Sequence, residues 1–301
     1  MKNHPSLSEI GARQNHQQDL RYRLAAAHFY RWAKWLRLGG GSISIALALA
    51  AAAVLLFRPS LGPYLGAIAG LWIFISRLLL ERWKREYQYK GATAQEHFDC
   101  EVLGIDWNNS LVRRLPHEDI SAASRSMEGE EDARNWYATE EKMQWPQSVL
   151  FCQRSNAVWA RRQHRSYANT VVAVAVAWAV FGVVLAAWHG TRLDDYLVIV
   201  ALPSLPAFLD ASELAAGHIS ASRSRELLEE QTDELLRNDH VSDEDIRLVQ
   251  DQLFVLRSDA PLVPGWFYKR LRPKFEQDMR YAAQQVAAAS KNTGKSSGGK
   301  E

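Results

Sequence analysis

The chain alternates between long apolar stretches and polar, charge-rich sequence. Two uncharged stretches, Leu38 to Phe57 and Pro59 to Ser76, follow each other with only Arg58 between them. Each is close to the roughly 20 apolar residues that an α-helix needs to cross the hydrocarbon core of a bilayer. The pattern therefore predicts a transmembrane hairpin over residues 38–80.

A second pair of apolar stretches follows later in the chain. Residues 169 to 190 are uncharged and contain the run VVAVAVAWAVFGVVLAAW, the clearest candidate span. The fourth candidate, Tyr196 to Leu209, is only fourteen residues long and carries Pro203 and Pro206. We count it as a span because the polar sequence after it is typical of a cytoplasmic helical domain. Prolines are tolerated in spans where neighbouring helices restore the lost hydrogen bonds. Residues 169–209 form the second predicted hairpin.

Basic residues stand at the polar ends of the predicted hairpins. They are Arg31, Lys34 and Arg37 before the first hairpin, Arg77, Arg82, Lys84 and Arg85 after it, and Arg161, Arg162 and Arg165 before the second. Lys and Arg in short flanking segments favour the cytoplasmic side of a membrane. The pattern predicts a multi-pass protein with both termini in the cytoplasm.

The segment before the first hairpin has the pattern of an amphipathic helix. From Asp19 to Leu38, apolar side chains recur among arginines, and Trp32 and Trp35 stand close to the first span. Trp and Arg have apolar bodies and polar tips that suit the headgroup zone of a membrane. We expect this helix to run to the membrane interface.

Three polar segments lie on the predicted cytoplasmic side. Residues 1–37, 81–168 and 210–290 are together long enough for one helical domain. Residues 291–301 are low in complexity, and we expect them to be disordered. The predicted fold class is an all-α membrane protein, with four transmembrane helices in two hairpins and a cytoplasmic helical domain built from the N-terminal, central and C-terminal segments.

Local signals define some helices within the polar segments. Gly91 predicts a break, followed by a short helix from Ala94 to Leu103 that ends near Gly104. Near the C-terminus, Ser242 is predicted to cap a helix with four apolar side chains on its inward face. These are Ile246, Val249, Leu253 and Phe254.

The charge balance limits what the protein is expected to bind. Lys and Arg number 36 and Asp and Glu 34, so the chain lacks the global basic field with which proteins attract a DNA or RNA duplex. A nucleotide contact would need a local pocket. Cys100 and Cys152 lie in predicted cytoplasmic segments, and we expect buried free thiols. The first 38 residues lack a short apolar run before a small-residue cleavage site, so a cleaved signal peptide is not expected.

Few residues suggest catalysis or a metal. His97, Asp99, Cys100 and Glu101 are metal-ligand types, but adjacent residues on a helix point in different directions and no second cluster supports them. The sequence has no phosphate-binding loop and no recognisable Ser/His/Asp arrangement. We therefore expect neither a catalytic site nor a metal site. The first three predicted spans contain no Asp, Glu, Lys or Arg, which argues against an ion pump.

Small residues recur in the predicted spans. Gly62, Gly66 and Gly70 are spaced by four and share one helix face, which allows close helix packing. The packing partner could be another helix of the same subunit or a second subunit. A pore would require the second arrangement.

Several short sequence pieces, in a fixed order around the predicted hairpins, resemble one family. They are Ile10-x-x-Arg13-Gln14-Asn15, Gln95-Glu96-x-Phe98-Asp99 leading to Trp107-Asn108, Trp136-Tyr137, Cys152-Gln153-Arg154-x-Asn156, and Pro261-Leu262-Val263-Pro264-x-Trp266-Phe267-Tyr268. The chain resembles the SMODS-associating four-transmembrane effectors of bacterial anti-phage signalling (CBASS) systems. It departs from that pattern at Ala138-Thr139, where the resemblance leads us to expect prolines.

The resemblance implies an inner-membrane effector that senses a cyclic oligonucleotide made by a partner nucleotidyltransferase, with no other cofactor. It implies that the activated protein forms a homo-oligomer and permeabilises the bilayer, so that the infected cell stops growing or dies. Phosphates and base faces suit arginine forks, amide side chains and aromatic rings. The candidate ligand contacts are Arg13, Gln14, Asn15, Trp107, Asn108, Gln153, Arg154, Asn156, Trp266 and Tyr268.

Other interpretations of the same residues stay open. Trp107 and Trp266 would also suit a helical core, and Gln153 and Asn156 would suit a brace where a helix enters the third span. A constitutive membrane scaffold that recruits a cytoplasmic partner through its leucine-striped C-terminal helices is an alternative to an effector. A membrane-embedded enzyme is a third, and its activity would depend on single polar residues such as Asp210 or Glu213.

Overall fold

The computed structural model is helical throughout its regular structure. It describes residues 4–57, 62–129, 133–139, 142–188, 190, 192, 202–238, 240–275, 277–278, 280–281 and 284. Within those residues every element of regular structure is a helix, which confirms the predicted all-α class. The chain divides into two compact units. Unit 1 comprises Met1–Val149, Ser242–Ser258 and Ala283–Glu301, and unit 2 comprises Leu150–Val241 and Asp259–Ala282.

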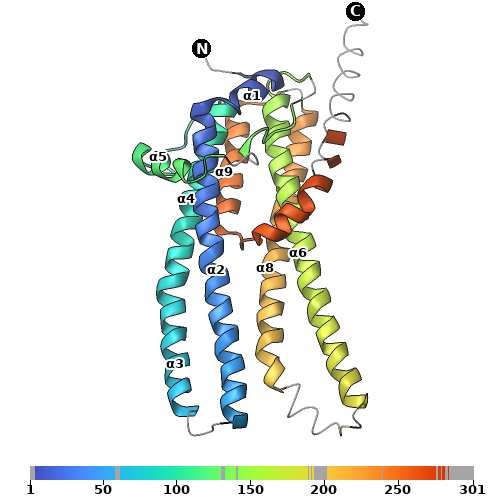
Figure 1. Ribbon diagram of the computed structural model, residues 1–301. Helices are drawn as coiled ribbons and strands as arrows, with labels where there is room; N and C mark the ends of the chain where they lie inside the picture. Colours follow the sequence, from blue (N-terminus) through green and yellow to red (C-terminus); the bar gives the residue numbers. More distant parts are fainter. Residues whose placement is uncertain are drawn as a thin grey trace, which may run out of the picture. The chain divides into compact units, whose positions relative to one another are not determined.

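Unit 1 is built around two long antiparallel helical columns (Figure 1). Its helices are α1 (Leu7–Arg13), α2 (Gln17–Phe57), α3 (Gly62–Ile75), the π-helix η2 (Ser76–Leu80), α4 (Glu81–Leu103), α5 (His117–Arg125) and α9 (Asp243–Asp259). One column is α2, and the other is α3, η2 and α4 in direct succession. Helix α2 packs along α4 and α3.

The prediction that a helix breaks at Gly91 is wrong. Helix α4 continues through this position, from Glu81 to Leu103. A Cβ atom at Gly91 would lie 3.1 Å from ring carbons of Tyr30 in α2, which is tighter than an ordinary contact. Glycine therefore serves a close approach of two helices here. The predicted end at Gly104 is confirmed, because Gly104 takes the left-handed conformation, with φ 69°, as the C-cap of α4.

The predicted cap and inward face of α9 are confirmed. The backbone N–H of Asp245 donates to Ser242 Oγ at 3.1 Å, and the backbone N–H of Ser242 donates to Asp245 Oδ2 at 2.9 Å. This reciprocal pairing satisfies donors that a helix start leaves free. The predicted apolar residues of α9 are all buried: Ile246, Val249, Leu253 and Phe254.

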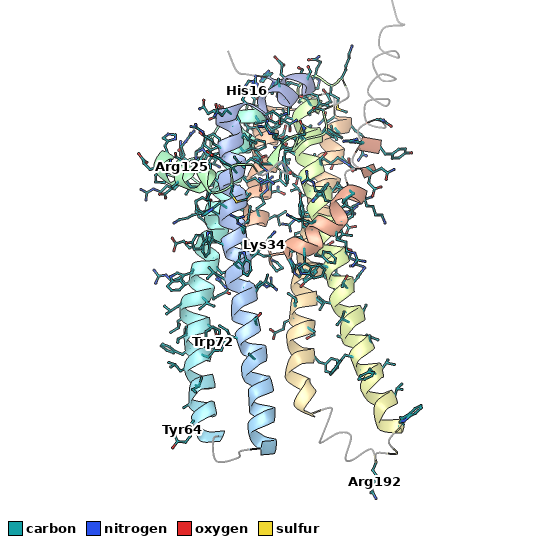
Figure 2. The ribbon with its side chains drawn as sticks, viewed as in Figure 1. His16, Lys34, Tyr64, Trp72, Arg125 and Arg192 are labelled. Atoms are coloured by element: carbon teal, nitrogen blue, oxygen red, sulfur yellow. The ribbon has the colours of Figure 1, made fainter. Side chains whose placement is uncertain are left out.

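The burial of side chains differs between parts of the two columns of unit 1. Buried residues occur in the first half of α2, between Leu20 and Ala33. In α3, by contrast, large apolar side chains on one helical face are each more than half exposed. These are Tyr64, Ile68, Leu71 and Phe74. Figure 2 shows Tyr64 pointing outward at the end of unit 1 remote from His16.

Unit 2 is organised around a second antiparallel pair. Helix α6 (Gln147–Trp188) contributes from Leu150 onwards, and it pairs with α8 (Leu202–Arg237) (Figure 1). A shorter helix follows over residues 265–275. The pairs Arg154 with Asp233 and Arg161 with Glu226 fix the antiparallel direction, because one partner advances along the chain as the other retreats.

One helix in the described part of the chain is long and apolar enough to cross a membrane. It is the Gln147–Val184 stretch of α6, whose most apolar window is almost entirely exposed. This stretch includes most of the predicted third span. The predicted turn at Arg58 and Pro59, the start of the fourth span and the tail 291–301 lie outside the described residues. Four spans therefore remain a prediction from the sequence.

Candidate functional site

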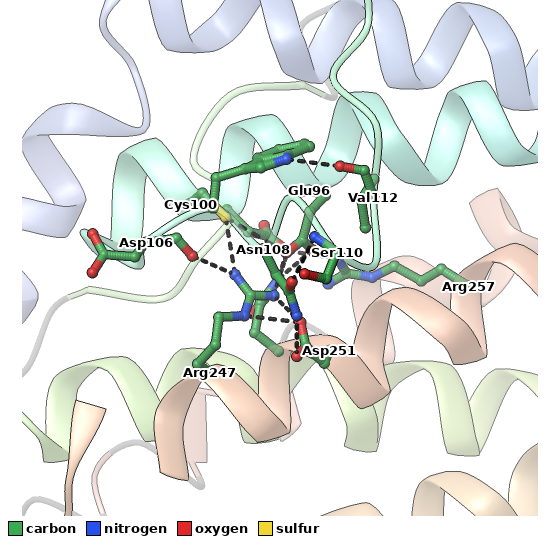
Figure 3. A network of polar contacts seen from close by, with 12 residues as sticks. Glu96, Cys100, Asp106, Asn108, Ser110, Val112, Arg247, Asp251 and Arg257 are labelled. Carbon is green, nitrogen blue, oxygen red and sulfur yellow. Dashed lines mark hydrogen bonds and ion pairs between the residues drawn. The ribbon is translucent and has the colours of Figure 1, made fainter. Parts of the chain in front are cut away.

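A buried polar network joins α4 to α9 within unit 1 (Figure 3). We call it the α4–α9 network; it consists of Glu96, Asp99, Arg247, Gln250 and Arg257. Arg247 Nη2 donates to Glu96 Oε1 at 2.6 Å, and Arg257 Nη1 donates to Asp99 Oδ2 at 2.6 Å. Gln250 Nε2 lies between the carboxylates, 2.8 Å from Glu96 Oε2 and 3.1 Å from Asp99 Oδ2. The spacing of three residues between Glu96 and Asp99 puts both acids on one face of α4.

Burial and pairing set the protonation behaviour of the α4–α9 network. Burial raises the pKa of Glu96, and the nearby Arg247 opposes that rise. Burial alone would lower the pKa of Arg257, but Asp99 and other nearby groups raise it above its ordinary value. Burial and then Glu96 raise the pKa of Cys100 well above its usual range. Cys100 therefore stays a protonated, unreactive thiol. Both Cys100 and Cys152 are buried and free, as predicted.

The amide side chains of Gln14 and Asn15 bind a distant loop. Gln14 Oε1 accepts from the backbone N–H of Tyr137 at 2.7 Å, and Gln14 Nε2 donates to the backbone oxygen of Tyr137 at 3.2 Å. Asn15 Nδ2 donates to Asn135 Oδ1 at 2.8 Å, and Asn15 Oδ1 accepts from the backbone N–H of Asn135 at 3.1 Å. These two candidate residues therefore act here as clamps on residues 133–139.

The clamped loop connects to the α4–α9 network. Tyr137 Oη donates to Asp99 Oδ1 at 2.7 Å, so Asp99 accepts hydrogen bonds from Tyr137, Gln250 and Arg257. Three separate sequence pieces, around Gln14, Asp99 and Tyr137, thus meet in unit 1. The polar side chains in these pieces therefore satisfy one another's hydrogen bonds, because buried polar atoms need partners.

Trp107 lies in a stack of rings at the end of α4. Its ring centroid is 4.3 Å from that of His97, which in turn is 5.0 Å from that of Tyr22. Trp107 Nε1 donates to the backbone oxygen of Val112 at 2.9 Å. The guanidinium carbon of Arg114 lies 4.8 Å above the Trp107 ring. Trp107 is half-buried, so it serves the core and also retains accessible ring surface.

His97 is a neutral member of this stack. Burial lowers its pKa to about 4, with further lowering by Arg114 and His117. Its Nε2 atom is buried and has no hydrogen-bond partner among the residues that the structure describes. Both the amide nitrogen and the amide oxygen of Asn108 are hydrogen-bonded. It donates to Asp251 Oδ2 at 2.9 Å and accepts from the backbone N–H of Ser110 at 3.0 Å.

In unit 2 the candidate Arg154 belongs to a ladder of ion pairs. We call it the α6–α8 ladder; it consists of Arg154, Arg161, Glu226, Glu229 and Asp233. Arg154 hydrogen-bonds Asp233 through two guanidinium nitrogens and reaches Glu229 Oε1 at 3.3 Å. Arg161 pairs with Glu229 at 3.0 Å and with Glu226 at 3.2 Å. Burial raises the pKa of Glu229, and Arg161 and Arg154 oppose that rise.

The other candidates differ in accessibility. Gln153 is fully buried in α6, and Asn156 is half-buried one turn further on. Trp266 is 58% exposed, and the Tyr268 ring lies 6.0 Å from that of Trp159. Of the ten candidates, five belong to unit 1 and five to unit 2. Those of unit 1 are Arg13, Gln14, Asn15, Trp107 and Asn108, and those of unit 2 are Gln153, Arg154, Asn156, Trp266 and Tyr268.

Two buried histidines form a pair in unit 2. His164 Nδ1 and His218 Nδ1 are 2.7 Å apart, so one ring donates a hydrogen bond to the other. Burial lowers the pKa of His164 to about 2, with further lowering by Arg225 and His218. His164 is therefore neutral at physiological pH, and its contact with His218 joins α6 to α8.

Two of the metal-ligand types noted on α4, Asp99 and Cys100, have other partners. Asp99 binds Tyr137, Gln250 and Arg257, and Cys100 contacts Glu96 and Arg247. Within the described ranges no group of three or more His, Cys, Asp or Glu side chains is arranged to hold a metal ion.

The sequence interpretation missed the α9 side of the network. Arg247, Gln250 and Arg257 were not among the candidates, although Gln250 lies within the predicted apolar face of α9. A polar residue in an apolar stripe is the available signal, because a buried amide needs a buried partner. The partner was not evident, since Glu96 and Asp99 lie about 150 residues earlier in the chain.

Comparison with known proteins identifies a family and a relative that aligns over most of its length. A family model described as the SMODS-associating 4TM effector domain matches residues 8–286. A protein of Bacillus cereus (strain VD146), named "Probable CBASS effector molecule", is 25% identical over 279 residues, which cover 89% of this chain and 94% of that protein. No solved structure matches the chain. The matched range contains all ten candidate contacts.

Proposed function

The chain belongs to the SMODS-associating 4TM effector family, and on this premise we propose that it is a membrane effector of a bacterial CBASS anti-phage system. A cyclic oligonucleotide from a partner nucleotidyltransferase activates it. The activated protein oligomerises and permeabilises the inner membrane without catalysing a reaction, and the infected cell stops growing or dies.

The family match from residue 8 to residue 286 carries this proposal. It includes both predicted hairpins and nearly all of the polar sequence. The Bacillus cereus protein, whose name describes a CBASS effector, supports the same assignment over almost its whole length.

Membrane residence has support from the surface of the helices. The apolar stretch of α6 is almost entirely exposed, and α3 exposes large apolar side chains. Water would disfavour both surfaces, whereas hydrocarbon suits them. In our proposal the chain crosses the inner membrane four times, with both termini in the cytoplasm, where the flanking Lys and Arg residues belong.

Ligand contact draws on the candidate residues of the polar part. Trp107 in unit 1 and the exposed Trp266 in unit 2 offer rings on which a base can stack. Arg154 would exchange Asp233 for a ligand phosphate, which an arginine fork also binds with two hydrogen bonds. The amides of Gln14, Asn15 and Asn108 support the site by holding loops in place.

Activation requires that the ligand bind the active state more tightly than the resting state. A shift of the populations from 1:99 to 99:1 takes roughly a 10⁴-fold difference in affinity. Continuous helices can transmit such a shift, because α2 and α6 each extend from polar sequence into apolar sequence.

The test is release of a small dye from liposomes that contain the purified full-length protein. Cyclic di- and trinucleotides of the four ribonucleotides are added one at a time, and linear oligonucleotides of the same composition serve as the control. We expect one cyclic compound to cause leakage and its linear counterpart to cause none.

The opposite result would be equally informative. If no compound causes leakage and calorimetry detects no binding, the effector assignment fails. The scaffold alternative then remains, and it predicts capture of a cytoplasmic protein rather than permeabilisation.

A further inference from the structure

The half-buried Trp107 and the exposed Arg114 form a pair at the surface of unit 1. The guanidinium carbon of Arg114 lies 4.8 Å above the centre of the Trp107 ring, and the Arg114 side chain is exposed. Among the described residues, no carboxylate lies within ion-pair distance of Arg114. The cation thus rests on an aromatic face, an interaction worth little at an exposed site and readily exchanged for another.

Three other arginines of the polar parts are already paired with carboxylates. Arg247 and Arg257 face Glu96 and Asp99 in unit 1, and Arg154 faces Asp233 in unit 2. A phosphate that approached any of these would have to displace a carboxylate. At Arg114 it would displace only a stacking contact, so the arginine is available for a ligand anion.

The Trp107 ring is held firmly from within. Its Nε1 donates to the backbone oxygen of Val112 at 2.9 Å, and His97 stacks against it at 4.3 Å. His97 is itself buried and stacked on Tyr22. A ring fixed in this way loses little conformational freedom when a ligand stacks on it, which favours affinity.

The two ends of the ring stack differ in the charged groups around them. Burial raises the pKa of Tyr22, at the far end of the ring stack; Glu101 and Asp19 raise it further, and Arg114 opposes that rise. Arg114 and His117 act on His97, closer to Trp107. A ligand phosphate is therefore favoured at the Arg114 end of the stack and disfavoured at the Tyr22 end.

We propose that Trp107 and Arg114 form a clamp for one nucleotide of the activating ligand. A base stacks on the Trp107 ring in the place of the Arg114 guanidinium, and the guanidinium turns to bind the adjacent phosphate. Asn108 is a positioning residue, because its bonds to Asp251 and Ser110 hold the loop that carries Trp107. This inference rests on the proposed function and assigns Arg114 a role that the sequence motifs do not.

Binding by charge-altered variants tests the phosphate contact. Full-length protein in detergent micelles is titrated with the cyclic di- and trinucleotides of the four ribonucleotides. The variants are Arg114→Glu, Arg114→Lys and the matched control Arg113→Glu, which makes the same charge change at an exposed neighbour. We expect Arg114→Glu to weaken binding roughly 10- to 100-fold, since a hydrogen bond to a charged group is lost. Arg113→Glu should weaken it far less, and Arg114→Lys should give an intermediate affinity.

A fluorescent probe tests the stacking contact separately. In a cyclic dinucleotide that carries one 2-aminopurine, stacking on Trp107 should quench the emission of the base. Trp107→Leu should abolish the quenching and weaken binding roughly 5- to 100-fold, whereas Trp107→Phe should retain part of both. Circular dichroism of each variant verifies that its helices are intact.

The outcomes separate this inference from the proposed function. If the wild-type protein binds one of the compounds and Arg114→Glu binds it equally well, the clamp is overturned and the effector assignment stands. If the wild-type protein binds none of them, the effector assignment fails and the clamp fails with it.

Discussion

The two units use charge in different ways. In unit 1 the carboxylates of the α4–α9 network are 2% and 0% exposed, at Glu96 and Asp99. In unit 2 the carboxylates of the α6–α8 ladder are 13% exposed at Glu229, 33% at Asp233 and 51% at Glu226. Buried charges must stay paired in one geometry, whereas partly exposed charges can exchange partners through water. The first arrangement fixes a packing, and the second allows helices to adjust.

The largest effect should come from breaking one pair in each unit. Arg257→Met leaves Asp99 buried without its cation, and we expect a loss of about 3–5 kcal/mol in the free energy of unfolding. Arg154→Met opens a partly exposed pair and should cost about 0.2–1 kcal/mol. Urea unfolding of both variants in detergent micelles, followed by circular dichroism, measures the difference. Equal losses would remove the distinction between the units.

A smaller effect should follow from removing the amide clamp on Tyr137. Gln14→Leu has a similar size but leaves the N–H and C=O of Tyr137 without their side-chain partner. We expect a loss of about 1–3 kcal/mol, the cost of unsatisfied buried polar groups. Gln17→Leu, at an exposed position at the start of α2, is the matched control and should change stability by less than about 0.5 kcal/mol. A loss of similar size in the control would contradict the clamp.

The smallest effect concerns pH and the histidine pair of unit 2. An unfolded histidine takes up a proton near pH 6.5, whereas burial keeps the pKa of His164 at about 2. Below pH 6.5 the unfolded chain therefore binds a proton that the folded chain does not. The contribution of His164 to the free energy of unfolding is fully present above pH 6.5. As the pH is lowered below 6.5, this free energy decreases by up to about 1.4 kcal/mol per pH unit.

Unfolding measured at pH 7.5, 6.5 and 5.5 would test this dependence. In His164→Gln the free energy of unfolding should depend less steeply on pH, because the unfolded chain binds one proton fewer below pH 6.5. His97 in unit 1, with a pKa lowered to about 4, should leave a residual slope of the same sign. An unchanged slope in His164→Gln would show that the His164 imidazole is not the protonated group.

Helices were predictable where a local signal fixed them. Ser242 with Asp245 caps α9, and Gly104 ends α4, because both signals act within a few residues. Gly91 misled the prediction because its reason lies in Tyr30, about sixty residues away on another helix. Local patterns carry no information about such contacts.

The same distance limits the candidate site. Gln14 and Asn15 are polar groups suited to a ligand, but their partners are Tyr137 and Asn135, more than a hundred residues later. Arg114 was not chosen because an exposed arginine has no distinctive pattern in a sequence. Its position over Trp107 becomes apparent only in three dimensions.

Helix α2 has a mechanical consequence. It runs unbroken for 41 residues, from Gln17 to Phe57, so at 1.5 Å per residue it is a rod about 60 Å long. Buried residues in its first half surround Leu24. A tilt of about 5° pivoted at Leu24 would displace the Phe57 end by about 4 Å over the intervening 50 Å or so. In such a tilt the helix would act as a lever: a rearrangement smaller than one side chain at its polar end would be enlarged to nearly the rise of a helical turn at the other.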